Sequence, residues 1–178
     1  MLPSDQLEEL AAVGVQRIID NPLESINVNV DGTKHVLEAC NRDKTPVFVA
    51  STSEIYGKNE NFPFEEGDDR VLGSITTSRW SYSCTKALDE FLGLAYWREK
   101  RLPVVIARFF NTVGPRQTGQ YGMVIPRFVK QALLGRPITV YGDGQQTRAF
   151  LDVDDATDAV IDLINCEECY GEPYNIGG

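Results

Sequence analysis

A tyrosine and a lysine stand four residues apart, at the start of a stretch whose apolar residues predict a helix. Tyr82 and Lys86 are separated by one helical turn, so their side chains share a face. A free phenol ionises near pH 10, too high for a base at neutral pH. An ammonium about 6 Å away, at an effective dielectric of about 20, favours the phenolate by about 2 to 3 kcal/mol. The pair predicts an acid/base, and a packed tyrosine beside a solvated lysine is the structural alternative.

Alternating helices and strands must position this pair. Apolar patterns predict helices at 22–41, 81–100, 124–135 and 154–165, and strands at 47–51, 104–109, 138–144 and 174–178. Polar residues 57–78 predict a long loop of the kind that usually has a function. The inner side of the second helix is expected to carry Leu88, Phe91, Leu92, Ala95 and Tyr96. The alternation implies an α/β fold with a parallel sheet and helices on its faces.

The expected strands direct polar residues to one edge of this sheet. Residues 51–54 (S-T-S-E) follow the strand at 47–51, and Asn111 follows the strand at 104–109. Ligands of open α/β sheets bind outside the carboxyl ends of the strands. Because the helix with Tyr82 and Lys86 lies between these strands in sequence, we expect all of these side chains to converge on one rim.

Four ordered segments resemble the extended short-chain dehydrogenase/reductase family, specifically the NAD-dependent nucleotide-sugar epimerases and dehydratases. The segments are S-T-S-E-I-Y-G at 51–57, Y-S-C-T-K at 82–86, R-F-F-N-T-V-G-P-R at 108–116 and Y-G-D-G-Q-Q-T-R-A-F-L-D-V-D-D at 141–155. The resemblance runs from about Leu10 to Gly178. It implies a partial Rossmann-like domain over 1–110, a small substrate-binding lobe over 111–147, and a return to the Rossmann-like sheet over 148–178.

The resemblance also assigns roles to individual residues. It implies that Tyr82 is the catalytic acid/base, that Lys86 is its partner and contacts the nicotinamide ribose, and that Thr52 bonds the reacting oxygen of the sugar. Ser53 and Glu54 would support them. Further NAD contacts are expected from Ala11, Ala12 and Asn29, the last in an N-x-x-G-T motif with Gly32 and Thr33. Nucleotide-sugar contacts are expected from Asn111, Arg116, Tyr141 and Arg148, with Arg148 on the diphosphate.

Sequence details distinguish reactions within the family. Dehydratases of the family carry Thr-Asp-Glu where this chain has Thr52-Ser53-Glu54, so the acid that expels water is missing. Uronic-acid decarboxylases do show Thr-Ser-Glu, and R-W-S-Y at 79–82 is also similar to one branch of them. Y-G-K at 56–58 and the R-Q-T-G-Q-Y-G loop at 116–122 are more similar to 4-epimerases. We therefore expect a UDP-sugar 4-epimerase that oxidises C4 transiently, with a decarboxylase or a cofactor-free binding module as the alternatives.

The 178 residues contain no G-x-x-G-x-x-G segment to approach the NAD pyrophosphate. The resemblance implies NAD as cofactor, but strong binding by this stretch alone is not expected. A sheet without the family's first strands would expose an edge and apolar faces. We expect a homo-oligomer, or a missing N-terminal segment that completes the sheet.

Composition excludes several classes of protein. A formal charge of −9 argues against nucleic-acid and anionic-membrane surfaces, and no apolar run is long enough to span a bilayer. Four cysteines and no signal-like N-terminus predict a cytoplasmic protein. Cys166-Glu-Glu-Cys169 lacks two further zinc ligands, and the only histidine, His35, is distant, so no metal is expected. Free thiols at a helix end are the expectation.

Overall fold

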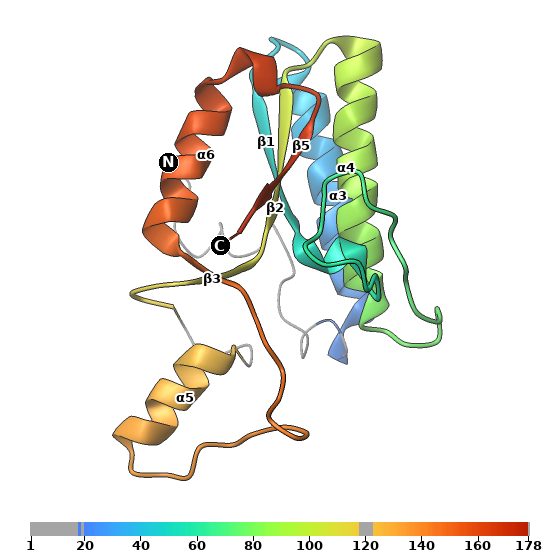
Figure 1. The fold of residues 1–178 in the computed structure, drawn as a ribbon. Helices are drawn as coiled ribbons and strands as arrows, with labels where there is room; N and C mark the ends of the chain where they lie inside the picture. The colour runs from blue at the N-terminus through green and yellow to red at the C-terminus, as the bar shows by residue number, and fades with distance from the viewer. Residues whose placement is uncertain (1–17, 19, 118–122, 178) are drawn as a thin grey trace.

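A three-stranded parallel sheet forms the centre of the molecule (Figure 1). The computed structural model describes residue 18, residues 20–117 and residues 123–177. The strand order is β1 (Val47–Thr52), β2 (Val104–Phe109) and β5 (Pro173–Ile176). The run V-V-I-A-R-F makes β2 the central strand, because almost every residue in it is buried. The predicted α/β fold with a parallel sheet is confirmed.

Helices cover both faces of this sheet (Figure 1). α3 (Pro22–Cys40) and α4 (Trp80–Lys100) lie on one side, and α6 (Val153–Asn165) lies on the other. Proline begins α3, where its fixed φ suits the first turn. α4 is followed by Arg101, which caps its C-terminus in the left-handed conformation with φ of 56°. The sequence-based bounds of both helices are correct to within a residue or so.

The main hydrophobic core lies between the sheet and the α3–α4 layer. Its buried members are Leu37, Val47, Val49, Leu102, Val104 and Ile106. α4 approaches β2 closely at Gly93, where a Cβ atom would lie only 3.1 Å from Val104 Cγ1. Glycine therefore lets the helix that carries the predicted catalytic pair pack tightly on the central strand.

The expected inner face of α4 is correct for Leu92 and Tyr96, which pack against the main core, and wrong for the three other residues. Leu88 and Phe91 are 43% and 57% exposed, and Ala95 is exposed as well. The buried residues of the helix are mostly polar: Ser83, Thr85, Lys86, Ala87, Asp89, Glu90 and Gly93. Apolar periodicity misjudges these three positions because charged and hydroxyl side chains occupy the buried positions of the helix, where they find partners.

A second group of elements follows the sheet, and its helix stands apart from the sheet (Figure 1). β3 (Asn111–Val113) pairs in parallel with β4 (Phe150–Asp152), and α5 (Val124–Leu133) lies beyond them. The strand predicted at 138–144 is absent, and these residues are exposed and end in a turn at Gly142 and Gly144, both with positive φ. The apolar alternation there meets no neighbouring strand, so it forms no ladder.

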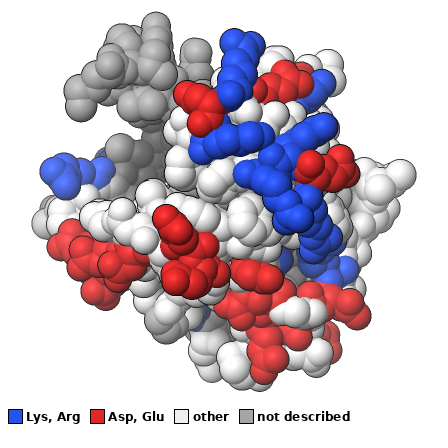
Figure 2. Space-filling model, turned by 90° about the horizontal axis from the view of Figure 1, so that it is seen from above, with Lys and Arg blue, Asp and Glu red and all other residues white. Residues whose placement is uncertain are grey.

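Charge is distributed unevenly over the molecule. After Arg148 the chain has eight carboxylates and no lysine or arginine, and Figure 2 shows acidic and basic side chains gathered on different parts of one face. Lys44, which follows α3, donates from Nζ to the carbonyl oxygen of Lys100 at the end of α4, 2.7 Å away. Cations at these two helix C-termini complement the helix dipoles. The strongly negative net charge therefore arises mainly in the last thirty residues.

Candidate functional site

Tyr82 and Lys86 lie one turn apart near the start of α4, as predicted. Lys86 is buried and Tyr82 is half-buried. His35, the single histidine of the sequence, is exposed on α3. The two side chains are thus held on a rigid helix whose opposite end is anchored in the core.

The segment Thr52–Glu54 lies at the carboxyl end of β1, where the parallel sheet delivers it. Thr52 ends β1, and its Oγ1 accepts a hydrogen bond from the backbone N–H of Glu54 at 3.2 Å. This contact caps η1 (Ser53–Tyr56), a short 3₁₀ turn. The cap fixes the direction in which the chain leaves the sheet, so Ser53 and Glu54 have defined positions.

Contacts between η1 and α4 bring the two predicted groups together. Ser83 Oγ donates to the carbonyl oxygen of Glu54 at 2.8 Å. The charge of Glu54 also acts on Tyr82, where it raises the pKa of the phenol. Glu54 remains partly exposed, yet loss of water around its carboxyl raises its pKa, while Arg79 acts in the opposite direction. The structure therefore places Thr52, Ser53 and Glu54 beside the first turns of α4.

The predicted acidity of Tyr82 is wrong for this chain. Burial, and then the negative charges of Glu54 and Asp89, raise the pKa of Tyr82 to about 12 instead of lowering it. Lys86 does not offset them, because its ammonium donates to Asp89 Oδ2 at 3.0 Å. At neutral pH the phenol is a protonated hydrogen-bond donor.

α3 supports the start of α4 from one side. Asn29 is buried, and its Nδ2 donates to Thr85 Oγ1 at 3.3 Å. Burial raises the pKa of Asp89, and a side-chain hydrogen bond from Thr33, one turn further along α3, acts against that rise. The N-x-x-G-T motif at residues 29–33 thus contacts the same helix as Tyr82 and Lys86. Its predicted role toward NAD stays a prediction, and Ala11 and Ala12 lie outside the described residues.

The predicted nucleotide-sugar residues lie in the second group of elements and are exposed. Asn111 on β3 donates from Nδ2 to the carbonyl oxygen of Ala149 at 2.9 Å, which helps to hold β3 beside β4. Arg148 donates only to its neighbour's carbonyl oxygen among the described contacts, and Arg127 lies over the ring of Tyr141 at 4.7 Å. Arg116 has a φ of 69° in the loop after β3. No contact joins this group to Tyr82 within the described residues.

Sequence reasoning missed a buried polar network next to the site. Arg108 on β2 donates from Nε and Nη2 to the carboxylate of Glu90 at 2.8 to 3.3 Å, and from Nη1 to Tyr56 Oη at 2.9 Å. Ser51 Oγ also donates to Glu90. Tyr56 Oη in turn donates to Asn175 Oδ1 on β5 at 2.7 Å. The signal was present in the charged residue in the middle of an otherwise apolar strand, because such a charge needs a buried partner.

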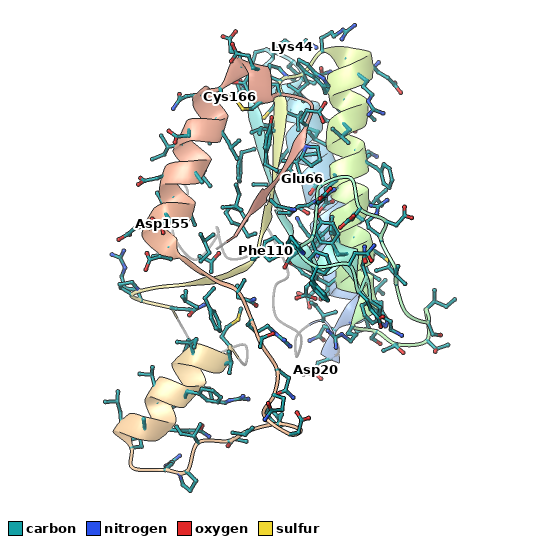
Figure 3. The ribbon with its side chains drawn as sticks, in the orientation of Figure 1. Asp20, Lys44, Glu66, Phe110, Asp155 and Cys166 are labelled. Atoms are coloured by element: carbon teal, nitrogen blue, oxygen red, sulfur yellow. A yellow bond between two sulfur atoms is a disulfide. The ribbon has the colours of Figure 1, made fainter. Side chains whose placement is uncertain are left out.

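The loop over 57–78 closes this network from outside (Figure 3). Its Glu66 lies beside β5 in Figure 3, where Glu66 Oε1 accepts from the backbone N–H of Asn175 at 2.8 Å. The carbonyl oxygen of Glu66 also accepts from Arg108 at 2.8 Å. The long loop is therefore fastened to the carboxyl halves of β2 and β5.

The structure offers no metal centre and no membrane-spanning helix in the part of the chain that it describes. No group of three or more His, Cys, Asp or Glu residues there could hold a metal ion, and no helix there has the length and apolar composition to cross a bilayer. Cys166 and Cys169 form a disulfide across η2 (Glu167–Cys169), with Cα atoms 5.3 Å apart. The expectation of free thiols is corrected, because the 3₁₀ turn brings the two side chains together.

Comparison with known proteins identifies the same family as the sequence motifs. The profile of the NAD dependent epimerase/dehydratase family matches residues 4–177. A curated Bacillus cytotoxicus protein, UDP-N-acetyl-alpha-D-glucosaminuronate decarboxylase, is 46% identical over 97% of this chain and 54% of its own length. The chain thus spans about half the length of the curated relatives that it matches.

Solved structures agree with this match. The UDP-N-acetylglucosamine 4-epimerase from Methanobrevibacter ruminantium, in complex with UDP-N-acetylmuramic acid, superimposes with a TM-score of 0.84 at 30% identity, over 94% of this chain and 53% of that one. The UDP-glucuronic acid 4-epimerase from Bacillus cereus, in complex with UDP-glucuronic acid and NAD, gives 0.78 at 32% identity, over 89% and 48%. Both structures share the arrangement of sheet and helices described above.

Proposed function

Because the chain belongs to the NAD-dependent epimerase/dehydratase family, we propose that it is the catalytic part of a decarboxylase of nucleotide-linked uronic acids. The observation that carries this proposal is the similarity to the decarboxylase relative over nearly the whole chain. The Thr52-Ser53-Glu54 segment beside Tyr82 supports it, since Ser53 has no acid with which to expel water. This reverses the order of the two reactions expected from sequence motifs.

The residues of the site divide the proposed chemistry among them. Tyr82 takes the proton of the sugar's C4 hydroxyl, Thr52 donates a hydrogen bond to the same oxygen, and Lys86 binds the ribose of the cofactor. A bound NAD would supply a hydride acceptor and donor for C4 and a positive charge that lowers the pKa of Tyr82. The nicotinamide end of NAD fits a protonated phenol and an ammonium on one helix face. The pyrophosphate end finds no G-x-x-G-x-x-G segment in these 178 residues.

Oxidation at C4 explains how the carboxylate leaves. The new ketone stands β to the carboxylate at C6, so the C5–C6 bond breaks and its electron pair passes into the carbonyl as an enolate. Carbon dioxide departs, and a proton from water adds to C5. Tyr82, now protonated, returns its proton to the C4 oxygen when the ketone is reduced. No external oxidant is consumed.

A 4-epimerase is the second candidate. It needs the same oxidation by the same residues, followed by return of the hydride to the other face of the ketone. The solved 4-epimerase structures favour it, as does the Y-G-K sequence at 56–58. The two candidates differ in whether the substrate carries a carboxylate at C6, and a cofactor-free module that binds nucleotide sugars differs from both in lacking turnover.

Calorimetry and product analysis test the proposal. The chain is titrated with NAD and with UDP-glucuronate, and then incubated with NAD and UDP-glucuronate, UDP-N-acetylglucosaminuronate or UDP-N-acetylglucosamine. We expect release of carbon dioxide from a uronic-acid substrate, and loss of at least about 100-fold of that rate in Tyr82→Phe, because general acid/base catalysis contributes about that much.

The outcomes separate the candidates. Epimerised UDP-N-acetylglucosamine without carbon dioxide release would overturn the decarboxylase in favour of the epimerase. Binding of UDP-glucuronate without NAD binding or turnover would leave the cofactor-free binding module as the remaining candidate. Absence of binding to any of these compounds would contradict the proposed function as a whole.

A further inference from the structure

Asp89 is a fully buried carboxylate on the same helix as the proposed catalytic pair. Its exposure is 0%, and it lies one turn beyond Lys86. The Lys86 ammonium contacts Asp89 Oδ2 at 3.0 Å, and the Lys86 side chain is only 10% exposed. The other oxygen, Oδ1, has no hydrogen-bond partner among the described residues. A carboxylate in this position is costly, because burial penalises its charge.

Stability does not account for this arrangement. A buried ion pair is often no more stable than apolar residues of similar volume, and loss of water raises the pKa of Asp89 despite the opposing charge of Lys86. The adjacent carboxylate, Glu90, has a different task, since it pairs with Arg108 and Ser51. Asp89 is thus the carboxylate of α4 that holds Lys86.

The charged groups around Tyr82 come from three directions. Glu54 acts from η1 and Asp89 acts from α4 itself. Arg79, just before α4, acts on Glu54. On the side of α3, the contact with Asp89 is made by the uncharged Thr33, and within α4 the charge of Glu90 also acts on Asp89. Lys86 is the cation of this group closest to Asp89, and Asp89 neutralises it.

We propose that Asp89 is a positioning residue of the proposed active site: it holds the Lys86 ammonium and offsets its charge, so that ionisation of the Tyr82 phenol depends on a bound cationic group. The inference deepens the proposed function and rests on it for its catalytic meaning. The effect of these charges on Tyr82 exists in the protein without any ligand, so it can be measured without a cofactor or a sugar. In this arrangement Tyr82 becomes a base only when a cationic group is bound beside it.

Tyrosine titration tests this directly. The chain is labelled with [¹³Cζ]tyrosine, the Tyr82 resonance is assigned with Tyr82→Phe, and its shift is followed from pH 8 to 13 while the amide spectrum monitors the fold. In Asp89→Asn the Tyr82 midpoint is expected about one pH unit lower than in the wild type, because one nearby negative charge is removed and Lys86 is left unpaired. Glu99→Gln removes the same charge from an exposed site on α4 and should leave the midpoint unchanged.

A second variant covers the case in which Asp89→Asn does not fold. Lys86→Met leaves the charge of Asp89 unopposed, so the Tyr82 midpoint should move higher. An unchanged midpoint in folded Asp89→Asn, or in folded Lys86→Met, would overturn the inference. Neither measurement uses NAD or a sugar. If the Tyr82 midpoints shift as expected but the chain binds no nucleotide, the proposed function is contradicted and the inference about Asp89 still holds.

Discussion

At the level of single residues, environment decides what Tyr82 can do. The spacing of Tyr82 and Lys86 predicts an acidic phenol, and the helix does place them on one face. The phenol is nevertheless harder to ionise than a free tyrosine, since Glu54 and Asp89 surround it and Lys86 is paired. Proximity of a cation lowers a pKa only when no closer anion cancels it.

The raised pKa of Tyr82 predicts a loss of stability in alkali. The folded phenol has a pKa of about 12 and an unfolded one ionises near 10, so between these values the folded state binds more protons than the unfolded state. The free energy of unfolding then falls as pH rises, by up to about 2 to 3 kcal/mol for this group. Urea denaturation at pH 9 and pH 11.5 measures the fall.

Tyr82→Phe should show a smaller fall over the same pH interval, because it lacks the titrating group. Tyr141→Phe, at an exposed tyrosine, serves as the matched control and should behave as the wild type does. If the free energy of unfolding falls equally in the wild type and in Tyr82→Phe, ionisation of this phenol does not destabilise the fold, and the prediction is contradicted.

At the level of elements, one buried ion pair joins the helix of the site to the central strand. Glu90 on α4 and Arg108 on β2 are 5% and 8% exposed at their side chains, and their charged atoms approach to 2.8 Å. Ser51, directly before Thr52, bonds to the same carboxylate. The pair therefore fixes α4 relative to the ends of β1 and β2, which is where the proposed catalytic side chains are mounted.

Glu90→Gln should destabilise the fold by about 3 to 5 kcal/mol, because it leaves the Arg108 guanidinium buried without a counter-charge. Glu38→Gln is the matched control: its partner Lys34 lies 3.9 Å away and both side chains are about half exposed, so its cost should be below about 0.5 kcal/mol. Urea denaturation followed by circular dichroism measures both.

The double variant Glu90→Gln/Arg108→Met should recover part of the stability lost in Glu90→Gln, because no buried charge then remains unpaired. A Glu90→Gln protein within about 1 kcal/mol of the wild type would mean that water reaches this pair in solution.

At the level of the whole molecule, the segment from β3 to β4 carries much of the exposed apolar surface. Leu133 is 82% exposed, and Leu134, Ile138 and Val140 are between 43% and 59% exposed. The α5 helix has no buried residue. In Figure 1 α5 stands apart from the sheet and its helices, whereas β3 and β4 contact α6. Apolar surface of this kind favours association.

We expect the chain to self-associate, and to do so more strongly at high salt. The formal charge of −9 repels one copy from another, and salt screens that repulsion without weakening apolar contacts. Sedimentation velocity from 1 to 100 µM, in 0.05 and 0.5 M NaCl, should show sedimentation coefficients that rise with concentration and rise more at 0.5 M. A monomer under all of these conditions would contradict the prediction.

Much of the fold follows from local pattern. The strand predicted at 104–109 has those bounds in the structure, and α3, α4 and α6 begin and end within a residue or two of their predictions. These segments combine a clear apolar period with a packing partner. Residues 138–144 have the apolar alternation of a strand but no neighbouring segment to pack against, and they form no strand. Apolar alternation shows that a segment is suited to be a strand, but a strand forms only when a neighbouring strand is there to hydrogen-bond with it.

The sequence alone determined the order of the helices and strands, the family, and the turn of helix that carries Tyr82 and Lys86, because each of these depends on residues close together in the chain. The tertiary structure decided how readily Tyr82 ionises and which face of α4 is buried. Both depend on residues brought from elsewhere, such as Glu54 from η1 and Arg108 from β2. Burial and charge act through space, so they are fixed only when the segments have packed.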